Sequence, residues 1–242
     1  MTNLIATEFL KLRTTRGPWL TIGIEVLLVI VGVSGLASRG LDASDPQQVQ
    51  LLFAHAGLAA FVTLIFGIGA FGTEYRYKTI TDTYLTTPDR RRVMLAKVAT
   101  YALAGLAFGV VTAATALAAA AAWGAADGVS LDLLGNEAWL TLGGAVAWNV
   151  LFAVIGVGLG ALLPNQSTAI AVALTWIALV EGLVAQLLGG LAEWLPLSAA
   201  RALGNAPAQD LLPQLGGGAV LAGYAVLLVI AAAAVSARRD VA

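Results

Sequence analysis

The 242-residue sequence contains no cysteine and a single histidine. Without cysteine the chain can form no disulfide bond and can offer no thiolate as a nucleophile or metal ligand. A single histidine cannot supply a pair of haem ligands or a histidine-rich zinc site within one chain. Most metal and redox chemistry is therefore excluded, and we expect no cofactor in this chain.

Charged residues are also scarce, because they make up 11% of the chain whereas an ordinary soluble domain has about 25%. Hydrophobic residues make up 59%, and the mean hydropathy is +0.86. A water-soluble surface cannot be built from that composition, so the sequence indicates an integral membrane protein. The formal net charge of -1 also argues against a nucleic acid partner, since such binding depends on neutralising phosphates.

Several catalytic motifs are missing from the sequence. There is no G-x-x-x-x-G-K-[ST], so the chain cannot bind ATP through a P-loop. Neither G-x-S-x-G nor H-E-x-x-H occurs, and His55 has no serine partner in a recognisable motif. These absences predict that the chain is not an enzyme.

What the chain has in abundance is long apolar runs. A helix needs about 20 mostly apolar residues to cross a hydrocarbon core of roughly 30 Å. We therefore predict an all-α integral membrane protein with a single transmembrane domain over residues 1–242. The six predicted spans are residues 19–37, 51–72, 98–123, 138–163, 168–189 and 217–236. The tryptophans that support these ends, by lying where the headgroup layer would be, are Trp19, Trp123, Trp139 and Trp194.

Small residues are frequent in the predicted spans, and they allow membrane helices to approach one another closely. Two motifs of this kind are Gly105-x-x-x-Gly109 and Gly156-x-x-x-Gly160. Each motif predicts a close helix contact without identifying the partner helix.

The positive charges are unevenly distributed among the connections. Eleven of the thirteen Lys and Arg residues lie in the two termini and the connection after the second span, which fall on one side of the membrane. The positive-inside rule then places both termini in the cytoplasm. A cleaved signal peptide is the alternative for the first span, but its apolar run exceeds the usual length of about 7–15 residues.

Residues 1–18 have the pattern of a short amphipathic helix. Ile5, Phe9 and Leu12 recur at helical spacing on one side, and charged side chains lie elsewhere around the helix. We expect an interfacial helix along the inner membrane surface. The alternative is a basic flank that only sets the topology.

The connection between the last two spans, residues 190–216, is external on this topology and too apolar for a free loop. It includes Trp194 and three prolines among leucines and alanines. Short helices that partly re-enter the outer leaflet would bury these side chains, provided that the backbone packs on protein.

Residues 73–97 form the longest cytoplasmic connection on this topology and carry six positive charges together with three tyrosines. Ile80 and Tyr84 fall on one side of a short helical stretch, and Asp89 can cap the helix that follows. We expect a protein partner for residues 74–85. The residues expected to contact anionic lipid headgroups are Arg90, Arg91 and Arg92.

Four polar side chains lie within the predicted spans, namely Glu25, His55, Asn149 and Glu181. Such groups usually face a cavity, a partner or another helix, so each is a candidate for a transport path or a dimer interface. We favour a structural role for His55 and Asn149, and Glu25 and Glu181 are the better functional candidates. No intramembrane Lys or Arg is predicted to pair with either carboxyl group, so each must be protonated, wet or hydrogen-bonded to neutral groups.

The connection after the second span resembles a known pattern. It contains Glu74-Tyr75-Arg76-Tyr77-Lys78-Thr79-Ile80, then Leu85-Thr86-Thr87-Pro88-Asp89-Arg90-Arg91-Arg92, and then Lys97. This order is similar to the pattern E-[YF]-x-x-x-T-[IL]…L-x-[TS]-P-x-x-R-x…K of ABC type 2 exporter permeases. The N-terminal stretch with Glu8 and Lys11, the six spans with inside termini, and the apolar segment before the last span resemble that family too.

The resemblance implies a multi-pass permease of a bacterial plasma membrane. Such a permease pairs with a second permease copy, as a homodimer or heterodimer, and with two separate ABC ATPase subunits that hold ATP and Mg²⁺. The resemblance also implies a coupling helix that docks in a cleft of the ATPase. The implied coupling residues are Glu74, Arg76, Thr79, Ile80, Asp82, Thr83, Tyr84 and Leu85.

The expected substrate is an amphiphile such as a drug, an antibiotic peptide, a lipid or a glycan, because hydrophobic pathway walls favour an amphiphile over an ion. Two other classes of protein stay open. One is a proton-coupled secondary transporter that uses Glu25 and Glu181, and the other is a non-transporting membrane scaffold.

Overall fold

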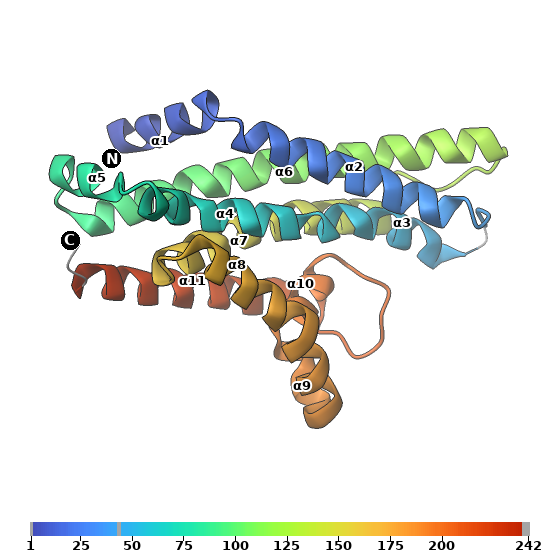
Figure 1. The fold of residues 1–242 in the computed structure, drawn as a ribbon. Helices are drawn as coiled ribbons and strands as arrows, with labels where there is room; N and C mark the ends of the chain where they lie inside the picture. Colours follow the sequence, from blue (N-terminus) through green and yellow to red (C-terminus); the bar gives the residue numbers. More distant parts are fainter. Residues whose placement is uncertain (1, 43–44, 239–242) are drawn as a thin grey trace.

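The computed structural model describes residues 2–42 and 45–238, and all regular structure in these residues is helical. Figure 1 shows a long bundle from which one helical arm diverges. The elements are α1 (Thr2–Thr14), α2 (Gly17–Ala37), α3 (Pro46–Leu58), α4 (Ala60–Arg76), α5 (Ile80–Thr86), α6 (Arg90–Asp127), α7 (Asn136–Leu162), α8 (Gln166–Thr175), the π-helix η1 (Trp176–Val180), α9 (Glu181–Leu188), the 3-10 helix η2 (Gly189–Trp194), α10 (Pro196–Leu203) and α11 (Gln214–Arg238).

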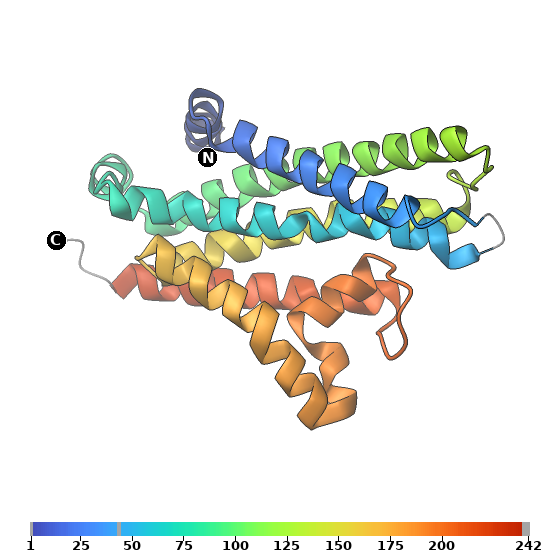
Figure 2. The same ribbon diagram turned by 45° about the vertical axis from the view of Figure 1, so that its right-hand side comes forward.

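Six segments of the described chain are long and apolar enough to cross a membrane, which confirms the prediction of six spans. They are Gly17–Ala37, Gln47–Arg76, Arg90–Asp127, Asn136–Leu162, Gln166–Leu187 and Gln214–Ala237. The second segment is made of α3 and α4 with Ala59 between them. The fifth comprises α8, η1 and most of α9, and it forms the diverging arm (Figure 2).

Two membrane segments begin five or more residues earlier than their predicted spans. α6 begins at Arg90 rather than at residue 98, because the Asp89 side chain accepts hydrogen bonds from the backbone N–H groups of the next turn. The second segment begins near Pro46 rather than at residue 51, since Asp45 caps that helix and proline is well suited to its first position. Hydropathy marks the part of a helix that lies in hydrocarbon, whereas the cap marks where the helix begins.

The core is built around α7, which packs against α3, α4, α6 and α11. The glycine motif of α7 faces α4: a side-chain carbon added at Gly156 would lie 2.3 Å from the Leu64 carbonyl oxygen, and one at Gly160 would lie 2.3 Å from that of Ile68. On α6, a side-chain carbon at Gly105 would lie 2.8 Å from the Asn149 carbonyl oxygen. Both predicted motifs therefore mark close backbone contacts with α7 as one partner.

One end of the bundle gathers α1, α5, the start of α6 and the end of α11 (Figure 1). We call it the basic end and the opposite end the far end. The helix expected within residues 1–18 is present as α1. Glu8 is buried and faces the bundle, whereas Phe9 is exposed.

The short helices expected within residues 190–216 are present as η2 and α10. α10 packs against the beginning of α11, where a side-chain carbon at Gly217 would lie 2.6 Å from the Ala199 carbonyl oxygen. Ala199, Ala200 and Leu203 are buried in this contact. Packing on protein thus accounts for the apolar side chains of α10, whereas Leu191 and Trp194 of η2 are exposed.

Candidate functional site

Four charged side chains from three helices meet at the basic end: Glu8 and Lys11 of α1, Glu74 of α4 and Lys97 of α6. The Lys97 Nζ lies 2.9 Å from Glu8 Oε2 and 2.7 Å from Glu74 Oε1. Lys11 also pairs with both carboxylates, and its Nζ lies 2.9 Å from Glu74 Oε1. We call this set the ion-pair cluster. Its two cations and two anions compensate one another, as buried charges must.

The side chains of the ion-pair cluster differ in their exposure to water. The Lys97 side chain is only 1% exposed, whereas that of Lys11 is 41% exposed. Burial alone would lower the pKa of Lys11, but the hydrogen bonds and charges of Glu8 and Glu74 outweigh burial and raise the pKa above its usual 10.5. When the pKa of a cation is higher in the folded state than in the unfolded state, its charge stabilises the fold. This stabilisation is complete at a pH below the unfolded pKa, and it is lost as the pH rises through the folded pKa. Lys11 therefore remains charged throughout the neutral range.

Helix α5 projects beside the ion-pair cluster at the tip of the basic end (Figures 1 and 2). A tight turn leads into it from α4, in which Lys78 has a φ of 57° and the Thr79 N–H donates to the Glu74 carbonyl oxygen at 3.0 Å. Asp82 and Leu85 lie on the outward face of α5, and Leu85 is 76% exposed. An apolar side chain exposed to this extent next to charged groups is suited to contact with a partner.

Not all the residues expected to couple to a partner lie on this outward face. Arg76 and Thr79 are exposed, and Thr83 is half-buried. Glu74 and Ile80 are buried, since Glu74 belongs to the ion-pair cluster and Ile80 is packed in the core. These two side chains lie beneath the outward face of α5 and do not line it, and their expected part in coupling stays a prediction.

Tyr84 and Arg90 connect α5 to the rest of the basic end. The Arg90 guanidinium lies 4.8 Å from the centre of the half-buried Tyr84 ring and also donates to the Ser236 carbonyl oxygen of α11. Burial raises the pKa of the Tyr84 hydroxyl, so the ring stays neutral. Arg90 is therefore engaged within the protein, which leaves Arg91 and Arg92 as the exposed members of the trio expected to contact lipid.

Inside the bundle, Glu25 of α2, Thr63 of α4 and Asn149 of α7 form one buried network. Thr63 Oγ1 lies within hydrogen-bond distance of Glu25 Oε1 and 2.8 Å from Asn149 Oδ1. A hydroxyl has one proton and can donate only once. Thr63 can therefore donate to Asn149 while a protonated Glu25 donates to Thr63, and the buried Glu25 Oε2 has no hydrogen-bond partner among the described residues. Asn149 in turn donates to the Ala145 carbonyl oxygen at 3.0 Å.

Glu181 has a different environment from Glu25. Its two carboxylate oxygens accept the Leu197 N–H at 2.9 and 2.8 Å, at the first turn of α10. Leu195, which precedes this helix, has no side-chain capping bond of its own. Glu181 thus serves as the N-terminal cap of α10, where a helix favours negative charge.

His55 is half-buried near the far end and packs against Gly32 of α2, where a side-chain carbon would lie 2.1 Å from the imidazole. Its Nδ1 lies 3.1 Å from the Leu51 carbonyl oxygen and 3.2 Å from that of Leu52. The structure therefore joins Glu25 and Asn149 through Thr63, and it gives His55 and Glu181 separate partners.

Two features were missed by reasoning from the sequence. One is the meeting of Glu8 and Lys97, which lie 89 residues apart. The other is Thr63, whose hydroxyl carried no signal because threonine is common in membrane helices. The sequence did contain a signal for the ion-pair cluster. Glu8 lies in an N-terminal helix with an apolar side, and Glu74 and Lys97 lie at the adjoining ends of the second and third predicted spans.

Comparison with known families gives one match. A family model described as ABC-2 family transporter protein matches residues 4–201, which include the ion-pair cluster, α5 and the first five spans. The chain belongs to the ABC-2 transporter family. The comparison with curated proteins gave no match.

Membership of the ABC-2 family confirms the resemblance found in the sequence and identifies a multi-pass membrane transport protein. Members of the family are membrane components of transporters and are generally not catalytic themselves. Membership implies an ABC transporter assembly with an ATPase partner.

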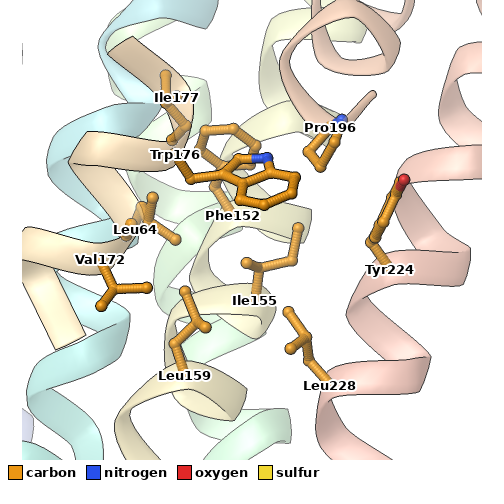
Figure 3. Close-up of a pocket in the computed structure, with 11 residues that line it drawn as sticks. Leu64, Phe152, Ile155, Leu159, Val172, Trp176, Ile177, Pro196, Tyr224 and Leu228 are labelled. Carbon is orange, nitrogen blue, oxygen red and sulfur yellow. The ribbon is translucent and has the colours of Figure 1, made fainter. Parts of the chain in front are cut away.

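This ABC-2 family protein also has an apolar cleft at the root of the diverging arm (Figure 3). The cleft has an empty volume of about 720 Å³, including its open side. It is lined by α4, α7, α8, η1, α10 and α11. The ion-pair cluster, the Glu25 network and this cleft are therefore three separate features.

Proposed function

We propose that the chain is the permease subunit of an ABC exporter in a bacterial plasma membrane. It pairs with a second permease copy and with two separate ATPase subunits, which hold the ATP and Mg²⁺. The basic end, with α1, α5 and both termini, faces the cytoplasm. The observation that carries this proposal is the ABC-2 family match over residues 4–201, which includes the entire α5 region.

In this proposal α5 is the coupling helix, and its outward face docks on the ATPase. The helix is tied to three others: Tyr84 contacts Arg90 of α6, Arg90 bonds to α11, and the turn before α5 bonds to Glu74 of α4. The ion-pair cluster then links α4 and α6 to α1. A displacement of α5 would therefore be transmitted to the spans.

The proposed substrate is an amphiphile, from among drugs, antibiotic peptides, lipids and glycans. Its path would run between the two permease copies. Support for an amphiphile comes from the spans, which present mostly apolar side chains, and from the buried carboxyl groups of Glu25 and Glu181, each of which has a hydrogen-bond partner within the chain. The same bonds give no support to a proton relay that uses these two residues.

The test is this chain purified together with a candidate P-loop ATPase and reconstituted in lipid vesicles. We expect Leu85→Asp to abolish stimulation of ATP hydrolysis, because it places a charge at the apolar centre of the docking face. The matched control is Leu134→Asp, which changes a leucine that is 66% exposed in the loop at the far end. Transport by the chain alone under a proton gradient, or equal effects of the two variants, would refute the proposal.

A further inference from the structure

The apolar cleft shown in Figure 3 is wide enough to hold a ligand. The space within the cleft itself is about 220 Å³, below the range of about 300–1,000 Å³ that sites for drug-sized molecules span, so the cleft suits a slender group rather than a bulky molecule. One wall is the arm of α8 and η1, the floor is α7, and the other wall is α11. The lining residues are Leu64, Phe152, Ile155, Leu159, Val172, Ala173, Trp176, Ile177, Pro196, Tyr224 and Leu228.

The cleft lies at the depth of the hydrocarbon core. Val172 is six residues after the start of α8, so it is about 9 Å from that end of the helix at about 1.5 Å per residue. Leu228 is ten residues before the end of α11, or about 15 Å. The cleft therefore begins within the leaflet of the basic end and reaches toward the middle of the membrane.

The lining offers a ligand no polar contact. The Tyr224 hydroxyl points out of the cleft in Figure 3 and donates to the Trp194 carbonyl oxygen at 3.2 Å. Pro196 closes the upper edge and has no N–H to offer, and the next residue, Leu197, gives its N–H to Glu181. Apolar cavities in proteins stay dry, so water is not the expected occupant.

The cleft is also open on one side, between two candidate spans that are mostly exposed. The arm and α11 are the least buried of the six candidate spans, and they form its two walls. At the root of the arm, the π-helical turn η1 interrupts the regular helix and brings Trp176 and Ile177 to the cleft. A dry groove at this depth, open between two exposed apolar spans, meets hydrocarbon chains wherever those spans are not covered by protein.

We propose that this cleft is a binding site for one hydrocarbon chain of a membrane phospholipid. The bound chain fills the wedge between the arm and α11 and packs against α7. The site requires only that the protein resides in a membrane, so it does not depend on the proposed export function.

The test uses a phosphatidylcholine that carries a photoreactive diazirine in the middle of one acyl chain. The purified chain is reconstituted in vesicles of phosphatidylcholine with a small fraction of this probe, irradiated, digested and mapped by mass spectrometry. We expect a higher adduct yield at Ile155 and Val172 than at residues on the exposed face of α11. The filling variant Leu228→Trp should lower the adduct yield at Ile155 severalfold.

The matched control is Leu227→Trp, which adds the same ring to the neighbouring residue, 65% exposed on the outer face of α11. It should leave the yield at Ile155 unchanged. If Leu228→Trp is not monodisperse, Val172→Phe fills the cleft from the opposite wall and takes its place. Adducts at Ile155 that persist in the filling variant, or crosslinks of the lining residues to a second copy of the chain, would overturn the proposal.

Discussion

At the scale of single residues, the spans contain charged and polar groups that are held by other parts of the same chain. Lys97 is enclosed by two carboxylates, and Glu25 meets a threonine hydroxyl rather than a cation. Both arrangements follow from the cost of leaving a polar group without a partner away from water. Each makes a specific prediction about what a substitution does to stability.

Lys97→Met should strongly destabilise the protein, because it leaves two buried carboxylates with a single shared cation, the partly exposed Lys11. Breaking a buried ion pair from one side costs about 3–5 kcal/mol. Thermal unfolding in detergent would measure the loss. The control is Lys78→Met, which removes an exposed lysine in the turn before α5 and should change stability by at most about 0.5 kcal/mol. Equal effects of the two variants would show that the ion-pair cluster does not stabilise the fold.

Glu25→Gln should be tolerated, because a protonated carboxyl and an amide both donate one hydrogen bond to Thr63 Oγ1. Thr63→Val should cost about 1–3 kcal/mol, since it leaves Glu25 and the Asn149 Oδ1 without their shared partner. Thermal unfolding separates these outcomes. Loss of transport in a stable Glu25→Gln protein would contradict this account and favour a proton-carrying role.

At the scale of elements, caps and small residues determine where helices begin and how closely they approach. Asp89 begins α6, Glu181 begins α10, and Gly156 lets α4 meet α7. The caps differ in one respect. Asp89 is adjacent to its helix in sequence, so that the sequence alone could predict it, whereas Glu181 lies 16 residues from the Leu197 N–H that it accepts.

Removing the distant cap should loosen α10. Glu181→Ala leaves the first N–H groups of α10 without an acceptor in an apolar setting, and loss of a cap costs about 0.5–2 kcal/mol. Hydrogen exchange should then speed up at Leu197 while it stays unchanged at Thr168, which the local Asn165 cap holds. If the exchange rates at Leu197 and Thr168 are the same in the Glu181→Ala protein as in the wild-type protein, the capping role is contradicted.

At the scale of the whole molecule, the pattern of apolar runs predicted the all-helical fold and the six spans, because hydrocarbon thickness sets a length that can be counted along a sequence. The local helical pattern likewise predicted α5. Contacts between segments that are distant in the sequence could not be predicted in this way. The meeting of Glu8 with Lys97, the burial of Glu74 and the diverging arm all depend on how the helices pack, and no local pattern specifies that packing.

The orientation of the molecule is the remaining prediction at this scale, and it rests on the distribution of Lys and Arg. The sequence lacks cysteine, so a single introduced thiol is a unique label. Leu85 at the basic end and Leu134 at the far end are both exposed leucines outside the spans, and they make a matched pair of positions.

The most direct test of the central claim, that α5 docks on an ATPase at the cytoplasmic face, is labelling of Leu85→Cys and Leu134→Cys with a membrane-impermeant maleimide. In inside-out vesicles, we expect Leu85→Cys to be labelled and to become protected when the ATPase subunit is present. Leu134→Cys should be labelled only in intact cells. Labelling of Leu85→Cys from outside intact cells, or labelling that the ATPase does not slow, would contradict the account.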